Sequence, residues 1–185
     1  MKTRLDLNDH IKVTVGLRDA QSIGINGLDC AGKTTFALDL KQQLEAIGRK
    51  AKLFHVDDFN NKGVQQRVYA AHASGEFSNE MFERYYNESV DYSALASAVT
   101  AATLPNQTVI VEGVFLYKPV LSHLFDYKVF LECDAGVARS RYAERRVDVV
   151  DDRPITIFDD IWLPAFTRYC DEFSPATIAD TVIKV

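Results

Sequence analysis

Short apolar runs alternate along the chain with segments in which apolar residues recur at helical spacing. The runs predict β-strands, because apolar side chains fill them or alternate there with polar ones. We expect strands at residues 10–17, 22–25, 52–56, 108–115, 127–131 and 181–185. The helical spacing predicts helices at 33–47, 92–102, 136–146 and 157–172, with short helices and loops at 60–89 and a charged loop at 145–154. Strands that alternate with helices are typical of an α/β fold with a largely parallel sheet.

Composition and charge narrow the class of protein. The 185 residues are 47% hydrophobic and 25% charged, which predicts one globular domain spanning 1–185. A formal net charge of −5 argues against a protein that coats nucleic acid, because positive charge supplies most of that affinity. We expect no membrane partner and no secretory signal, since no apolar stretch is long enough. The three cysteines (Cys30, Cys133 and Cys170) lie far apart, so we expect reduced thiols in a cytoplasmic protein. The sequence does not distinguish a monomer from a homo-oligomer.

Residues 27–34 read GLDCAGKT and match the phosphate-loop pattern G-x-x-x-x-G-K-[ST]. Gly27 and Gly32 allow the backbone to wrap a phosphate, and the following helix N-terminus attracts the anion. Lys33 would place its charge between the terminal phosphates, and the Thr34 hydroxyl would bind Mg²⁺. A chance match before a helix is the alternative, and the strand–loop–helix setting argues against it. We expect ATP and Mg²⁺ as ligands, with nucleotide contacts from Gly27, Asp29, Cys30, Ala31, Gly32, Lys33, Thr34 and Thr35.

Carboxylates follow two of the predicted strands. Asp57 and Asp58 come directly after the strand at 52–56, and Glu112 follows the apolar residues 109–111. Ligands of open α/β sheets bind beyond the C-terminal ends of strands, so we expect these acids near the phosphate loop. Carboxylates there can accept a proton from a hydroxyl and hold Mg²⁺ or its waters. A helix N-cap or loop acid is the alternative for Asp57, whereas an unpaired acid at Glu112 would be costly to bury.

These segments together resemble the uridine kinase and phosphoribulokinase family of P-loop kinases, which includes nicotinamide riboside kinases. The resemblance rests on residues 27–34, on HVDDF at 55–59 and on VIVEGV at 109–114, and it extends from about residue 22 to the end. It implies a three-layer P-loop NTPase fold with a central mainly parallel sheet flanked by helices. It also implies that Asp57 is the base toward a sugar hydroxyl and that Glu112 supports Mg²⁺ and substrate. Residues 85–92 (YYNESVDY) stand where that family has a segment rich in Asp and Phe, which leaves the nucleoside open.

An arginine cluster falls within a lid expected at about 139–154. Lids of the resembled family have arginines here, so Arg141, Arg145 and Arg146 are the candidates for stabilising the transferring phosphoryl group. A solvated charged helix is the alternative. In the acceptor site, aromatic rings could stack on a base and polar groups could bind ribose hydroxyls, although each residue could equally belong to the core or surface. The acceptor-site candidates are Asp57, Phe59, Arg84, Tyr85, Asp91 and Glu112. His55 is expected to be a packed, neutral strand histidine.

The sequence therefore predicts an ATP-dependent kinase that phosphorylates a hydroxyl of a small molecule, with the 5′-hydroxyl of a nucleoside as the first expectation. Lys33, Asp57 and the lid arginines would carry catalysis, and Thr34, Asp57 and Glu112 would bind the metal. Nicotinamide riboside, pantothenate or a sugar is the alternative acceptor, and ATP is not distinguished from GTP. A regulatory NTPase is disfavoured because the Asn-Lys pair at 61–62 lacks the Asp of N-K-x-D. A non-catalytic nucleotide-binding module is disfavoured because the reactive residue types occur together.

Overall fold

Five parallel strands form one sheet in the order β2-β3-β1-β4-β5. The computed structural model describes residues 20–148, 151 and 153–185, so the strand expected at 10–17 lies outside the described residues. The strands are β1 (Ser22–Gly27), β2 (Lys50–His55), β3 (Gln107–Gly113), β4 (Tyr127–Glu132) and β5 (Thr181–Lys184). The central strands β1 and β3 are buried on both faces, as their apolar sequences predict.

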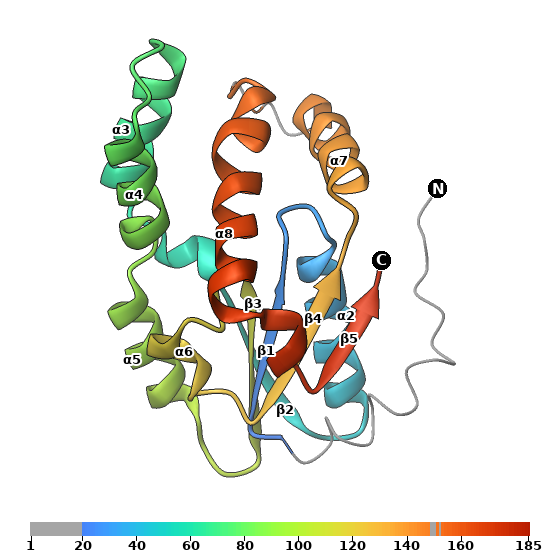
Figure 1. Ribbon diagram of the computed structural model, residues 1–185. Coiled ribbons are helices and arrows are strands. Elements are labelled where there is room, and N and C mark those ends of the chain that lie inside the picture. Colours follow the sequence, from blue (N-terminus) through green and yellow to red (C-terminus); the bar gives the residue numbers. More distant parts are fainter. Residues whose placement is uncertain (1–19, 149–150, 152) are drawn as a thin grey trace.

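Helices cover both faces of this sheet and make three layers (Figure 1). Helix α2 (Lys33–Ala46) packs on one face, while α5 (Tyr92–Ala102), α6 (Pro119–Ser122) and α8 (Leu163–Phe173) pack on the other. Helices α3 (Lys62–Ala73) and α4 (Asn79–Glu88) form a hairpin that extends beyond the C-terminal ends of the strands (Figure 1). The remaining helices are α7 (Ala135–Asp148) and α9 (Pro175–Ile178). The arrangement confirms the expected α/β fold with a parallel sheet.

The amphipathic face of α2 agrees with the prediction except at its end. The buried residues of that face include Phe36, Ala37, Leu40 and Leu44. Ile47, the last residue of the helix expected at 33–47, is 57% exposed, because the helix ends at Ala46 and the chain turns away there. Gly48 follows with a φ of 81°, a left-handed conformation that glycine adopts without strain at the end of a helix.

Three further boundaries differ from the predictions. The strand expected at 52–56 ends at His55, because Val56 begins the 3₁₀ turn η1 (Val56–Phe59). The helix expected at 157–172 begins with a π-helical turn, η2 (Phe158–Trp162), before α8. Helix α7 also continues through Arg145 to Asp148, where a loop was expected. Across the described ranges, every helix is too short or too polar to cross a bilayer.

Candidate active site

The phosphate loop joins β1 to α2. Its conformation needs a residue without a side chain at one position and left-handed backbone angles at two others. A Cβ on Gly27 would lie 2.8 Å from the backbone oxygen of Leu131, so the close approach of β1 and β4 requires glycine. Cys30 and Gly32 have φ values of 62° and 93°, and such left-handed positions turn backbone N–H groups toward one concave surface. Within the described residues no side chain caps the N-terminus of α2. Its N–H groups are therefore available to an anion.

Lys33 and Thr34 both lie at the base of this loop. The Lys33 side chain is buried and folds back across the loop, where its Nζ donates to the Leu28 carbonyl at 2.8 Å. The Thr34 hydroxyl donates to Glu112 Oε1 at 3.0 Å. This contact joins the start of α2 to the end of β3, across a sequence separation of 78 residues.

Glu112 is held where three strands meet. Its backbone pairs with Ile25 of β1 and with His55 of β2 in the parallel registers. Its Oε1 lies 2.6 Å from His55 Nδ1 and also accepts the hydrogen bond from Thr34, so this buried carboxylate has polar partners. The expectation of a packed His55 is wrong, because its side chain is 34% exposed and contacts the acid. The register places it at the same edge of the sheet as Glu112.

The chemistry of this cluster suits a hard divalent cation. Thr34 and Glu112 offer oxygen ligands 3.0 Å apart beside the phosphate loop. Mg²⁺ is usually held by one or two protein oxygens together with phosphates and waters rather than by a complete protein cage. In keeping with this, no group of three or more His, Cys, Asp or Glu side chains suited to a metal occurs in the part of the chain that the structure describes.

Asp57 lies in the 3₁₀ turn η1, directly after β2. Its carboxylate is exposed, accepts a hydrogen bond from Asn60 Nδ2 at 3.3 Å and lies within electrostatic range of Asp29 and Tyr85. The alternative that Asp57 is a helix N-cap is wrong, because Asn61 caps α3 by accepting from the Val64 N–H. Gly113 permits this arrangement, since a Cβ there would lie 2.3 Å from Val56 and displace the turn that presents Asp57.

Asp29 is an acidic side chain within the phosphate loop itself, and it is half-buried. Burial raises the pKa of its carboxyl above the usual value. The Lys33 ammonium opposes that rise, whereas the Asp57 carboxylate adds to it. Arg145 and Arg153 also favour the charged form of Asp29. Asp29 therefore lies within electrostatic range of one other carboxylate and three cations.

The lid arginines divide between two environments. Arg141 Nη1 lies 3.5 Å from the Cys30 carbonyl and 3.6 Å from Cys133 Sγ, and Arg145 lies within electrostatic range of Cys30. Arg146 instead lies over the ring of Tyr142, with 5.8 Å between its Cζ and the ring centroid. The structure thus brings Arg141 and Arg145 to the phosphate loop and directs Arg146 elsewhere.

Arg153 is a site residue that the sequence did not single out. Its Nε and Nη2 donate to the two carboxylate oxygens of Asp151 at 2.8 and 2.6 Å. Its guanidinium lies 5.6 Å from the Tyr69 ring centroid and 5.0 Å from that of Trp162. These contacts fix the cation within electrostatic range of Asp29. In the sequence, Arg153 stands out only by its position in the charged stretch 145–154. That position does not distinguish it from the other charged residues of the stretch.

The predicted acceptor residues do not all gather in one place. Tyr85 is buried, and its ring centroid lies 6.2 Å from that of Tyr69. It is within electrostatic range of Asp29 and Asp57, and burial raises the pKa of its hydroxyl well above the usual value. Arg84 lies on the exposed side of α4, where its Nε donates to Glu88 at 3.3 Å. Phe59 is half-buried and packs against Phe54 with their ring centroids 6.2 Å apart.

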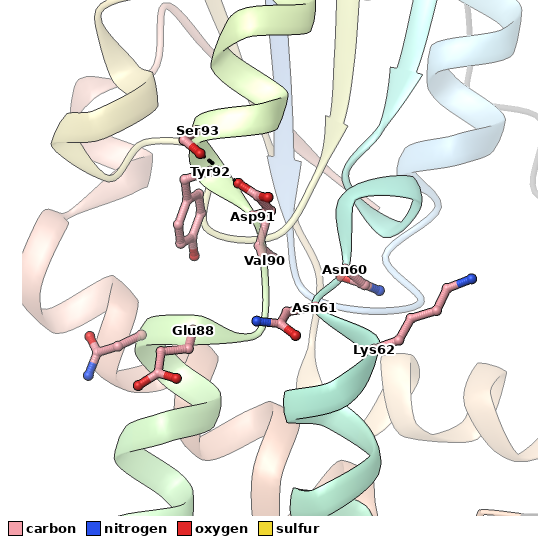
Figure 2. A pocket seen from close by; sticks show the side chains of 9 residues that line it. Asn60, Asn61, Lys62, Glu88, Val90, Asp91, Tyr92 and Ser93 are labelled. Carbon is pink, nitrogen blue, oxygen red and sulfur yellow. Dashed lines mark hydrogen bonds between the residues drawn. The ribbon is translucent and has the colours of Figure 1, made fainter.

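Asp91 has a structural role at the start of α5. Its Oδ1 accepts hydrogen bonds from the Ala94 N–H at 2.9 Å and from the Ser93 hydroxyl at 2.8 Å, and these bonds lower the pKa of its carboxyl. It also lines an open hollow of about 620 Å³ between the start of α3 and the end of α4 (Figure 2). The other polar lining residues are Asn60, Asn61, Lys62, Asn87, Glu88, Tyr92 and Ser93. An acceptor-binding role for Arg84, Phe59 or Asp91 stays a prediction.

Comparison with known proteins agrees with this geometry. A family model described as an AAA domain matches residues 23–155. A possible uridine kinase from Bacillus stearothermophilus superposes with a TM-score of 0.69 at 20% identity, over 97% of this chain and 100% of that one. A candidate fructose transport system kinase from Silicibacter sp. TM1040 gives a TM-score of 0.66 at 16% identity, over 93% and 97% of the two chains. No curated protein matches the sequence. These likenesses establish a P-loop kinase fold and confirm the expected three-layer P-loop NTPase architecture.

Proposed function

The chain belongs to the AAA domain family of P-loop proteins, and from that premise we propose that it is an ATP-dependent small-molecule kinase. The proposed reaction transfers the γ-phosphoryl group of ATP to a hydroxyl, with the 5′-hydroxyl of a nucleoside as the favoured acceptor. The observation that carries the proposal is the 3.0 Å contact between the Thr34 hydroxyl and Glu112 Oε1. It brings a phosphate-loop hydroxyl to a strand-end acid, the pair of oxygen groups that phosphoryl transfer uses around a magnesium–nucleotide complex.

Binding of the triphosphate rests on the loop and on two arginines. The N–H groups of residues 27–34 and of the α2 N-terminus would receive the phosphates. Lys33 Nζ, now on the Leu28 carbonyl, would turn by rotation of its side chain toward the terminal phosphates. Arg141 and Arg145 would close over them from α7, neutralising charge and excluding water. Thr34 and Glu112 would hold Mg²⁺, which would supply positive charge to offset the negative charge of the phosphates.

Asp57 is the proposed base of the transfer. It would accept the proton of the acceptor hydroxyl while the oxygen of that hydroxyl bonds to the γ-phosphorus. The bond from the γ-phosphorus to the bridging oxygen breaks at the same time, and ADP leaves with its electron pair. An exposed carboxylate in the turn after β2 is suited to this, because an incoming hydroxyl can reach it.

The acceptor is the least constrained part of the proposal. The two compared kinases bear names that refer to different compounds, one a nucleoside and the other a sugar. Both compounds present hydroxyl groups, which supports a hydroxyl acceptor in general. A nucleoside remains our first choice, and nicotinamide riboside, pantothenate or a sugar is the alternative.

An acceptor panel tests the proposal. The full chain is incubated with Mg²⁺ and ATP or GTP plus uridine, cytidine, nicotinamide riboside, pantothenate, ribose or fructose, and ADP or GDP release and the phosphorylated product are measured. At least one hydroxyl acceptor should be phosphorylated, and Asp57→Asn should reduce kcat by about 10²- to 10⁴-fold while nucleotide binding persists. Unchanged turnover of Asp57→Asn would remove Asp57 from the mechanism. GTP hydrolysis independent of acceptor would instead indicate a regulatory NTPase, and tight ATP binding without any transfer would indicate a binding module.

A further inference from the structure

The proposed reaction gives no role to His55, although its ring contacts Glu112. The ring nitrogen Nδ1 lies 2.6 Å from Glu112 Oε1, which is a short hydrogen-bond distance. The side chain of Glu112 is 7% exposed and that of His55 is 34% exposed, so a buried acid is paired with a ring that solvent reaches. A buried carboxylate needs hydrogen-bond donors, and in the described part of the chain His55 and Thr34 supply them.

The parallel register of β2 and β3 brings the two side chains together. His55 is the last residue of β2, and it pairs directly with Glu112 of β3. Paired residues of neighbouring strands present their side chains on the same face of a sheet. Thr34 reaches the same acid from the start of α2. Three elements that are distant in sequence therefore meet on one carboxylate.

Both donors use the same oxygen of that carboxylate. Oε1 of Glu112 lies 3.0 Å from Thr34 Oγ1 and 2.6 Å from His55 Nδ1, whereas no group in residues 20–148, 151 and 153–185 donates to Oε2. Two hydrogen bonds on one oxygen restrict the rotation of the carboxylate about its Cγ–Cδ bond. Oε2 is thereby left to a ligand. Thr34 directs its proton to Glu112, so the lone pairs of its hydroxyl remain for the same ligand.

The hydrogen bond from His55 does not depend on the charge of the ring. The carboxylate form of Glu112, which is the form that binds a cation, only accepts hydrogen bonds. Nδ1 carries a proton in the imidazolium ion and also in one of the two neutral tautomers, so the ring can donate in both charge states. The contact therefore requires only an N–H group at the position of Nδ1.

We propose that His55 is a positioning residue of the magnesium site. Its Nδ1–H group holds Oε1 of Glu112 and thereby keeps Oε2 available to the metal ion of the nucleotide complex. Hydrogen-bond partners of metal ligands typically contribute about 10- to 100-fold to metal affinity. The inference rests on the proposed function in that it requires a magnesium–nucleotide complex. It adds a residue that acts through Glu112 and does not itself touch the substrate.

The test measures how much Mg²⁺ strengthens nucleotide binding, which requires no turnover. Calorimetry gives the Kd of the non-hydrolysable analogue β,γ-imido-ATP for the full chain, with saturating Mg²⁺ and with EDTA. The ratio of the two values, the magnesium effect, should exceed about tenfold in the parent protein. His55→Leu removes the donor and should lower the magnesium effect by about tenfold. The Kd in EDTA should change by less than about twofold, because the loop that binds the phosphates is intact.

Two polar variants test the position of the N–H group. His55→Asn keeps an N–H group at the same number of bonds from the backbone as Nδ1, whereas His55→Gln moves it one bond farther, to the place of Nε2. The Asn variant should retain the magnesium effect to within about threefold, and the Gln variant should lose as much of it as the Leu variant. This comparison stands even if His55→Leu does not fold.

His123→Leu is the matched control for the loss of an imidazole. His123 is exposed, and its Nδ1 lies 3.2 Å from the Pro119 carbonyl oxygen. The magnesium effect in this variant should equal that of the parent protein. An equal loss in His55→Leu and His123→Leu would mean that the contact with Glu112 has no part in it.

A double-mutant cycle with Glu112→Gln shows whether His55 acts through the acid. The magnesium effect is measured for His55→Leu, for Glu112→Gln and for the double variant. If His55 acts by holding Glu112, the double variant should equal Glu112→Gln to within about twofold, because the carboxylate that His55 positions is already gone. Losses that multiply in the double variant would show that His55 acts independently of Glu112, and this result would overturn the proposal.

The remaining outcomes also contradict the proposal. An unchanged magnesium effect in His55→Leu, or retention by Gln and not by Asn, would exclude the Nδ1 contact as the one that matters. Equal weakening of binding with Mg²⁺ and in EDTA would assign His55 to the nucleotide or to the stability of the strand ends. A parent protein without any magnesium effect would remove the metal site as well. The kinase proposal is judged separately, because the acceptor panel detects transfer by the parent protein whatever these variants do.

Discussion

The hydroxyl of Tyr169 holds the side chain of Asn26, which donates to it from Nδ2 at 2.6 Å. The same hydroxyl accepts from the Tyr117 N–H at 2.9 Å, and Asn26 Oδ1 accepts from the Gly27 N–H at 3.0 Å. All of these groups are buried. Helix α8 therefore fixes the residue that precedes the phosphate loop, even though it contributes no residue to the loop.

Replacing Tyr169 by Phe should destabilise the protein by about 1–3 kcal/mol, because the Asn26 amide and the Tyr117 N–H would lose a buried acceptor. The free energy of unfolding is measured by urea titration. Tyr127→Phe is the matched control, since the Tyr127 hydroxyl lies 2.7 Å from Thr181 Oγ1 at a partly buried position where water can replace it. Equal losses of unfolding free energy in the two variants would show that the hydrogen bond with Asn26 contributes no more to stability than the partly buried one with Thr181.

Replacing Glu112 by Gln should raise the Mg²⁺ concentration for half-maximal activity by about 10- to 100-fold. The amide oxygen can still accept from Thr34, but it lacks the negative charge that favours a divalent cation. The measurement is a Mg²⁺ titration of turnover at saturating ATP and acceptor. Glu132→Gln, at an exposed position beside Lys184, should leave the titration unchanged. An unaltered Mg²⁺ requirement in Glu112→Gln would exclude this carboxylate from the metal site.

The parts of the site that could be predicted from sequence depend on local patterns. The phosphate loop is a contiguous motif, and its amide geometry follows from the glycines at fixed spacing. The positions of Asp57 and Glu112 follow from topology, because parallel strands present their C-terminal ends at one edge of the sheet. The bounds of α5 also agree with the expected helix at 92–102, where alanine-rich sequence lies between an N-cap residue, Asp91, and a turn.

The parts that could not be predicted depend on contacts between distant segments. Arg153 is fixed by rings from α3 and from the π-helical turn, and no local pattern specifies which residues those rings approach. Arg84 and Tyr85 are adjacent in sequence, yet the helix places them in different environments, one partly exposed and one buried.

Arg145 and Arg139 provide a paired test of the lid. Arg145 lies within electrostatic range of Asp29 and Cys30 of the phosphate loop, whereas Arg139 Nε donates to Asp159 at 2.8 Å on the exposed side. Arg145→Gln should lower kcat about 10²-fold or more, because it removes a cation from the transferring phosphoryl group. Arg139→Gln should change kcat less than twofold, since an exposed ion pair contributes little. Steady-state kinetics at saturating substrates gives kcat for both variants. Similar losses of kcat would indicate that the removal of any arginine charge from α7 lowers turnover.

Lys118 has an unusual environment that predicts a pH dependence of stability. Its Nζ is buried, donates to the Tyr86 carbonyl at 2.6 Å and lies 3.8 Å from the Tyr86 ring centroid and 4.9 Å from that of Phe115. Burial lowers the pKa of Lys118 to about 8 from a usual value of 10.5, although the Glu172 carboxylate favours the charged form. Between these two pH values the unfolded chain binds more protons than the folded one. The free energy of unfolding should therefore rise with pH in this window.

The Lys118→Met variant isolates this contribution. The difference in unfolding free energy between the parent protein and the variant should increase by at most about 1 kcal/mol per pH unit from pH 8 to 9.5. This range stays below the pH at which the tyrosines ionise. Lys184→Met, at a highly exposed side chain, should show a constant difference. A constant difference for Lys118→Met as well would mean that the surrounding rings and the Tyr86 carbonyl keep the ammonium charged throughout the folded state.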